Sequence, residues 1–183
     1  MHAIARCTRP ELVNALFEYF HPQSVPLDAA TCPHIMDAGH NQMVCDTCRA
    51  CATRTALNLP DANKFWPIHA AAWNRNTPFV AHHLRIKGAH ATFATANCRD
   101  GGNFFHTTCA SLSAVDWLES LWESVIVNES DRLIAAQALT IKSRRGRTPL
   151  DMAKFQFEHR TEVDGFVKRR TYDWVTRVIA LVQ

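Results

Sequence analysis

Apolar residues recur at helical spacing in three segments of the chain, 10–20, 78–89 and 114–122. In each segment they fall one, three or four positions apart, so they line one side of a helix while polar residues cover the other. Gly88, near the end of the second segment, supplies a helix stop. The pattern predicts three amphipathic helices. The residues expected on their buried sides are Leu12, Val13, Leu16 and Phe17; Phe79, Val80 and Leu84; and Val115, Leu118, Leu121 and Trp122.

Two further helices are expected towards the C-terminus. Residues 131–139, DRLIAAQAL, follow Ser130, whose hydroxyl is expected to cap the first turn. Residues 171–183 also have an apolar stripe at helical spacing, and such a helix is expected to close a stack of helices at its end. The residues of this stripe are Tyr172, Val175, Ile179 and Val182.

A short phrase recurs along the chain. Its clearest copy is GRTPLDMA at 146–153, and FWPIHAAA at 65–72 and GNFFHTTCA at 102–110 keep its outline. MHAIA at 1–5 and TCPH at 31–34 are poorer copies. Each of the three amphipathic helices follows one copy of this phrase along the chain. The chain is therefore predicted to consist of helix-turn-helix units. The equivalent anchors His2, His34, His69, His106 and Asp151 are 32, 35, 37 and 45 residues apart.

These repeats resemble the ankyrin repeat, which has about 33 residues, a turn and two helices, and the phrase T-P-L-H-x-A. Thr148-Pro149-Leu150 is the one complete copy of that phrase's start, and the intervals between the other copies drift upward. The resemblance implies an all-α ankyrin-like helix-turn-helix solenoid with a C-terminal capping helix, in a single domain spanning 1–183. The units are expected at about 1–30, 31–64, 65–101, 102–145 and 146–183.

The resemblance also implies how such a protein works. A histidine at the anchor position fixes the turn into the first helix, and loop tips and first-helix faces form a concave surface that recognises another protein. The basic cluster at 142–147 falls at such a loop tip. Degenerate, cysteine-rich arrays of this kind are frequent in large DNA viruses, intracellular bacteria and protists, which implies a host-directed interaction protein. The candidate partner-binding residues are Lys64, Trp73, Arg99, Asn103, Arg144, Arg145 and Arg147.

Composition narrows the function classes. A hydrophobic content of 47% predicts a folded chain, and a formal charge of +3 is too slight to indicate nucleic acid or membrane binding. No apolar run approaches the roughly 18 residues that span a bilayer, and the N-terminus lacks a signal-peptide core. Seven cysteines, an odd number, fit a reduced intracellular compartment such as the cytoplasm, or that of a host cell.

Two alternatives to a protein-binding scaffold carry chemistry. Cys32, His34, Cys45 and Cys48 have an order and spacing that tetrahedral zinc sites use, which predicts a zinc-binding module at 32–51. The same stretch also fits a second repeat, in which cysteine is a small buried hydrophobe and no metal is needed. The other alternative is a small Cys–His enzyme, but the chain lacks the common catalytic motifs. We therefore expect no enzymatic activity.

Overall fold

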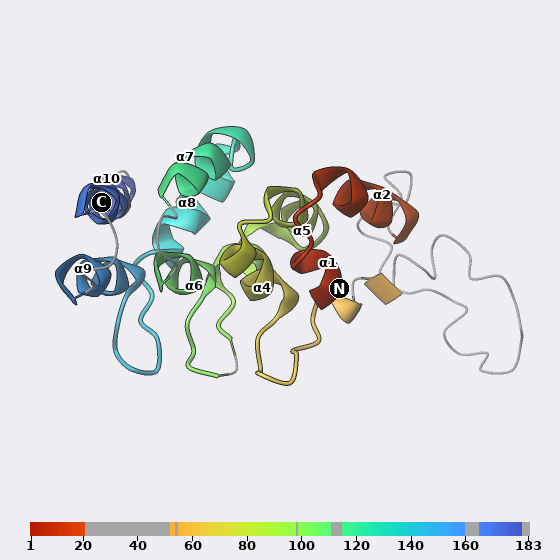
Figure 1. Cartoon of the computed structure of the whole chain (residues 1–183), viewed down its shortest axis with the longest axis horizontal. Helices are drawn as coiled ribbons and strands as arrows, with labels where there is room; N and C mark the ends of the chain where they lie inside the picture. The colour runs from red at the N-terminus through yellow and green to blue at the C-terminus, as the bar shows by residue number, and fades with distance from the viewer. Residues whose placement is uncertain (21–51, 54, 98, 111–114, 160–164, 181–183) are drawn as a thin grey trace, which may run out of the picture.

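The computed structural model describes residues 1–20, 52–53, 55–97, 99–110, 115–159 and 165–180. Every regular element among these residues is a helix, which confirms the all-α class. Figure 1 shows the helices in two parallel rows along the long axis, with loops projecting from the outer side of one row. None of the described helices is both long enough and apolar enough to cross a membrane.

The first row follows the recurring phrases. It consists of α1 (His2–Ala5), α4 (Pro67–Asn74), α6 (Phe104–Ala110) and α9 (Pro149–His159). Each of these helices contacts the next along the row (Figure 1). In α4 the alanines 70–72 are buried, and such small side chains let neighbouring helices approach closely. The phrase is therefore a packing signal as well as a turn signal.

The second row runs alongside the first and lies above it in Figure 1. It consists of α2 (Pro10–Phe20), α5 (Thr77–Ala89) with the π-helical turn η2 (His90–Ala94), α7 (Val115–Ser124), α8 (Glu129–Ala138) and α10 (Gly165–Ala180). Contacts again follow the order of the chain, from α2 to α5, from η2 to α8 and from α7 to α10. Each described first-row helix has at least one second-row helix beside it, which Figure 1 shows above the first row.

One continuous core runs between the rows. Phe17 of α2 and Phe79 of α5 are both fully buried, with ring centroids 5.2 Å apart and edge to face. Further along, Phe93 of η2 lies against Phe104 and Phe105 of α6, at 5.4 and 5.7 Å. Aromatic pairs at such distances add to the free energy of burial. The packing thus links consecutive units as well as the two helices within each.

The predicted apolar stripes are mostly confirmed. In α7 all four residues of the stripe are buried, and in α5 Phe79 and Val80 are buried while Leu84 is half-buried. In α2 the stripe is narrower than predicted, because Leu12 is 39% exposed. Gly88 has a φ of 79° and breaks the regular helix as expected, but the chain continues at once into η2.

Two details of the C-terminal helices were predicted wrongly. Helix α8 begins at Glu129 after Asn128, so Ser130 lies inside its first turn and does not cap it. Of the described side chains of α10, the buried ones are Thr171, Trp174, Val175 and Val178, while Tyr172 and Ile179 are only half-buried and Val182 lies outside the described residues. The ring of Trp174 lies edge to face with that of Trp122 in α7, at 5.9 Å, and this large pair decides which face turns inward.

Helix α10 packs on α7 and α9 at the end of the stack (Figure 1). Arg170 adds ion pairs to Asp116 and Glu119 of α7, each at 2.7 Å. These side chains are partly exposed, so the ion pairs contribute little stability and mainly fix orientation. The expected C-terminal helix therefore covers the last first-row helix and its neighbour.

Three loops have the same backbone geometry five residues before an anchor. Lys64, Gly101 and Gly146 each have a positive φ, of 64, 72 and 73°. Each loop is closed by a backbone hydrogen bond across its neck, for example from Ser143 N to Arg147 O at 2.8 Å. Figure 1 shows the three loops projecting side by side from the first row. The loops are thus in register with the anchors His69, His106 and Asp151.

Of these three positions, only position 64 holds a residue with a side chain, and the backbone of Lys64 is in the left-handed region. Replacing Lys64 by glycine is expected to raise the free energy of unfolding by about 0.5 kcal/mol, because relief of left-handed strain exceeds the added entropy of the unfolded chain. Urea denaturation measures the change. Lys154→Gly, inside α9, is the matched control and is expected to destabilise by about 1 kcal/mol. A destabilised Lys64→Gly protein would contradict the shared loop geometry.

The turns into α6 and α9 use a reciprocal pair of hydrogen bonds, whereas the turns into α1 and α4 have no side-chain cap, although His69 occupies the anchor position of α4. Thr148 N donates to Asp151 Oδ2 at 2.8 Å, and Asp151 N donates back to Thr148 Oγ1 at 3.1 Å. Asn103 and His106 repeat the pattern at 3.1 and 3.2 Å, with the His106 ring nitrogen Nδ1 as acceptor. The other ring nitrogen, Nε2, donates to Arg147 O at 2.8 Å. His106 therefore fixes the turn, as expected for an anchor histidine.

Candidate functional site

Two adjoining hollows lie between the first-row helices and the loops. The larger, of about 440 Å³, extends from Arg6 and Asp61 to Arg99. The smaller, of about 190 Å³, continues from there to Arg145 and Arg147 of the last loop. Both are lined by Phe65, Trp73 and Thr107, so they form one depression, which we call the loop-side groove.

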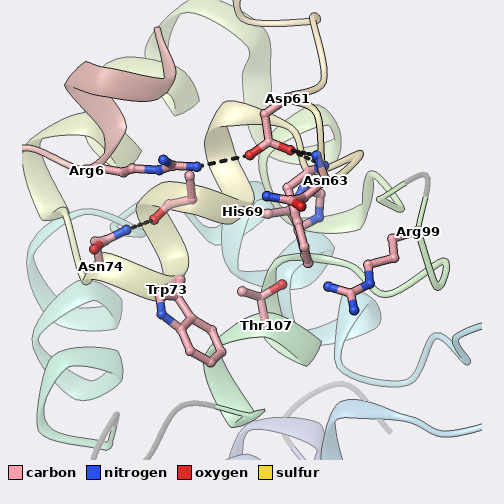
Figure 2. Close-up of a pocket in the computed structure, with 10 residues that line it drawn as sticks. Arg6, Asp61, Asn63, His69, Trp73, Asn74, Arg99 and Thr107 are labelled. Atoms are coloured by element: carbon pink, nitrogen blue, oxygen red, sulfur yellow. Dashed lines mark hydrogen bonds and ion pairs between the residues drawn. The ribbon is translucent and has the colours of Figure 1, made fainter.

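Trp73 is the largest exposed side chain of this groove. The preceding residues of α4 are buried, but Trp73 lies near the C-terminal end of the helix and is 57% exposed. Figure 2 shows its ring extending into the hollow, with Thr107 next to it and Arg99 on the opposite side. A tryptophan this exposed leaves apolar surface in water, which is typical of a binding surface.

The anchor register explains the space beside Trp73. It lies four residues after its anchor, and the equivalent positions in α6 and α9 are Ala110 and Phe155. Phe155 is 38% exposed, and Ala110 lies in the lining of the smaller hollow. The short side chain of Ala110, between two aromatic positions, leaves the groove open at α6.

Arginines dominate the charge of the groove. The lining contains Arg6, Arg99, Arg145 and Arg147, all exposed. Arg99 lies over the ring of Phe65 at 5.8 Å, and Arg147 lies over Phe155 at 5.2 Å. Stacking of this kind holds a guanidinium in place while its donors remain accessible.

The two carboxylates of the lining already have partners. Asp61 accepts hydrogen bonds from the N–H groups of Asn63 and Phe65, at 2.9 and 3.0 Å, and from Arg6 at 3.0 Å (Figure 2). Burial raises its pKa, but these backbone hydrogen bonds outweigh burial and the net pKa is lowered. Asp100 has a lowered pKa for the same reasons, burial being outweighed by a hydrogen bond from Gly102 N at 2.9 Å and by Asn97. Both aspartates are therefore ionised, and their carboxylate oxygens accept hydrogen bonds that stabilise the loops.

Four of the predicted partner-binding residues lie in the loop-side groove, namely Trp73, Arg99, Arg145 and Arg147. Lys64 lies at a loop and is exposed, but it is outside this lining. Arg144 packs against the next loop instead, with its backbone N–H donating to Asp100 O at 2.9 Å. A Cβ on Gly101 would stand 2.8 Å from the Arg144 side chain, so this close approach requires glycine.

Asn103 is wrong as a partner-binding residue. It is fully buried, and its side-chain amide donates to Ala138 O at 2.6 Å. It occupies the capping position that Thr148 occupies in the last copy of the phrase, and it also joins α6 to the end of α8. Its role is structural because none of its surface is available to a partner.

Sequence reasoning missed the other part of the lining, notably Arg6, Asp61, Phe65 and Thr107. Arg6 and Asp61 are 55 positions apart and meet only through the stacking of units. A signal for Arg6 was nevertheless present, since it lies four residues after the anchor His2, in the register of Trp73. The polar loop positions carry no comparable signal.

The predicted metal ligands Cys32, His34, Cys45 and Cys48 lie outside the described residues. Among the residues that are described, no group of three or more His, Cys, Asp or Glu side chains is arranged to hold a metal ion. Cys109 is buried, and burial raises the pKa of its thiol to about 12. A nucleophilic cysteine needs the opposite shift, so Cys109 is an inert core residue.

Comparisons with protein-family models, with curated proteins and with solved structures give no match to this chain. The loop-side groove combines exposed apolar surface with fixed guanidinium groups. Such a surface binds by burying aromatic area and by pairing charge.

Proposed function

We propose that this chain is an ankyrin-like repeat scaffold that binds a protein partner through the loop-side groove, without catalysing a reaction. Three features support the proposal. The first-row helices stack in chain order, the three loops share one left-handed position, and the turns into α6 and α9 share a reciprocal hydrogen-bond pattern. Repeat stacks of this kind present one long surface built from equivalent positions of successive units.

The exposure of Trp73 carries the proposal. Its indole is 57% exposed beside Phe65 and a stacked arginine, in a hollow whose polar lining comes from the loops and from His69, Asn74 and Thr107 of the helices. Tryptophan and arginine are the residues most enriched among those that dominate binding energy at protein interfaces. Core packing does not account for Trp73, because the core is complete on the other side of α4. The setting we propose is a reducing compartment, consistent with the unpaired thiols of Cys7 and Cys109.

The test compares proteins captured by the intact chain and by Trp73→Ala from a lysate of the source cells. Removing the indole is expected to lower the recovery of the specific partner at least tenfold, since truncating a central aromatic costs about 2 kcal/mol or more. Mass spectrometry with isotope labelling measures recovery.

Leu133→Ala is the matched control. Leu133 lies on α8 in the second row and is 47% exposed, so it also removes exposed apolar surface, but far from the groove. Recovery is expected to be unchanged, and circular dichroism checks that both variants fold. Equal loss with both variants, or with neither, would contradict binding through the groove.

A further inference from the structure

We propose that the occupant of the loop-side groove is an extended, acidic segment of a partner protein, with apolar side chains that lie against the aromatic positions of the first row. This inference rests on the proposed function and deepens it by naming the chemistry of the partner. Charge, apolar surface and the spacing of the first-row helices each contribute to it.

Charge is the first step. The lining carries four arginines and two aspartates, and both aspartates have hydrogen-bond partners within their own loops. Arg6 is committed to Asp61, and Arg145 lies near enough to Asp100 to lower its pKa. Arg99 and Arg147 stack on Phe65 and Phe155, and neither forms an ion pair with another described residue. The groove therefore has surplus positive charge at two fixed positions, which favours a partner with carboxylates.

Apolar surface is the second step. A purely acidic ligand would leave the indole of Trp73 and the gap at Ala110 in contact with water. An apolar side chain placed there buries the indole and removes its own surface from water. The occupant must therefore combine acidic and apolar residues.

The spacing of the helices is the third step. Adjacent packed helices have axes about 8–10 Å apart, so Trp73 on α4 and Phe155 on α9, with α6 between them, are about 16–20 Å apart. An extended chain advances about 3.3 Å per residue. Two apolar side chains about six residues apart lie on the same face of an extended segment and would reach both aromatic positions, with carboxylates between them facing Arg99 and Arg147.

A polypeptide fits this groove better than a nucleic acid does. A phosphate backbone places negative charge at every step, and it would pass the ionised Asp61 and Asp100 of the lining. A peptide can place its carboxylates at the arginines and neutral residues at the aspartates. Single-stranded nucleic acid is nevertheless the competing occupant that the experiment must distinguish.

The test is fluorescence anisotropy with the full chain and three labelled peptides of about 12 residues. The first carries two leucines about six residues apart among Asp and Glu, the second has Lys at the acidic positions, and the third has Ser at both leucine positions. The acidic–apolar peptide is expected to bind in the micromolar range, and the other two at least tenfold more weakly. Raising the salt concentration from about 50 to about 300 mM is expected to weaken binding several-fold, because the charges lie at a solvated surface.

Variants of the chain locate the site. Arg99→Glu and Trp73→Ala are each expected to weaken binding of the acidic–apolar peptide about tenfold or more. Ala110→Leu fills the gap and is expected to weaken binding without a change of charge. Arg9→Glu, at an exposed residue outside the lining, is the matched control for the charge change and is expected to leave binding within about twofold.

Each outcome decides the inference. Preference for the lysine peptide, tighter binding of a single-stranded oligonucleotide, or binding that Trp73→Ala and Arg99→Glu do not alter would overturn it. If no peptide binds but capture of a partner still depends on Trp73, the acidic-segment inference fails while the proposed function stands. If capture is also independent of Trp73, the proposed function fails as well.

Discussion

The free energy of unfolding is expected to fall by about 4 kcal/mol between pH 7 and pH 5, because two buried histidines are held neutral in the folded chain. Burial lowers the pKa of His69 from 6.5 to about 4 and that of His83 from 6.5 to about 3. Below pH 6.5 the unfolded chain therefore binds more protons than the folded chain. Stability is fully present above pH 6.5 and is lost as the pH falls towards the folded pKa values.

The surroundings of each ring account for the shift. His83 Nδ1 donates a hydrogen bond to Thr92 Oγ1 at 2.9 Å, since the Thr92 hydroxyl itself donates to Gly88 O, and burial is the main cause of the lowered pKa of the ring. Lys87 and His69 lower the pKa of His83 further. Backbone groups of Thr95 and Gly102 and the charge of Asp100 partly raise the pKa of His69, but neither ring nitrogen makes a well-aligned hydrogen bond to a described residue, and burial prevails.

Urea denaturation at pH 7, 6 and 5 measures this loss. His69 and His83 are each expected to contribute about 2 kcal/mol over this interval, and His106, whose pKa burial also lowers, adds to the loss in the same direction. The aspartates with lowered pKa values contribute little above pH 5 because they titrate below it. His83→Gln keeps a donor towards Thr92 and is expected to remove the share of His83, about 2 kcal/mol. His90→Gln, at an exposed position of η2, is the control and is expected to retain all of it. Equal stability at pH 7 and 5 would show that His69 and His83 are not held neutral by burial.

Phe93→Ala is expected to lower the free energy of unfolding by about 3–5 kcal/mol, the usual cost of removing a large buried ring. Phe93 is fully buried and its ring contacts those of Phe104 and Phe105, so the side chain joins η2 to α6. The loss includes both the transfer of the ring and the cavity that it leaves. Leu133→Ala, at a 47% exposed position, is expected to cost less than about 1 kcal/mol.

Thermal and urea denaturation followed by circular dichroism distinguish these outcomes. Because consecutive units share this aromatic cluster, Phe93→Ala is expected to destabilise the stack on both sides of η2. If Phe93→Ala and Leu133→Ala cost the same, the aromatic cluster would not be the link between the units. If Phe93→Ala is too unstable to purify, Phe93→Leu takes its place in the comparison. A smaller decrease in the free energy of unfolding is expected for Phe93→Leu.

The second-row helices were largely predictable because their apolar stripes follow a simple period. All four predicted residues of α7 are buried, and the recurring phrase marks the first-row helices at 67–74, 104–110 and 149–159. Periodicity alone does not determine which face of α10 is buried. The apolar residues of 171–183 fit either of two neighbouring helix faces, and contact between Trp174 and Trp122 of α7 selects the face that is buried.

The candidate site was less predictable because it is assembled from several units. Trp73, Arg99, Arg145 and Arg147 were found from their positions near first helices and loop tips. Asn103 was misassigned because an exposed loop residue and a buried cap look alike in sequence, and only its alignment with Thr148 reveals the difference. The pairing of Arg6 with Asp61 depends on how the first two described units stack, which no local pattern encodes.

Site-specific photocrosslinking is the most direct test of the loop-side groove as the partner-binding surface. A photoreactive amino acid is placed at Asn74, which lines the groove next to an intact Trp73, or at Leu133 on the second row, and the chain is irradiated in its source cells. Position 74 is expected to crosslink to one protein partner, through an acidic segment with apolar residues, while position 133 does not. Crosslinks from position 133 alone, or to the same partner equally from both, would contradict a partner-binding site in the groove.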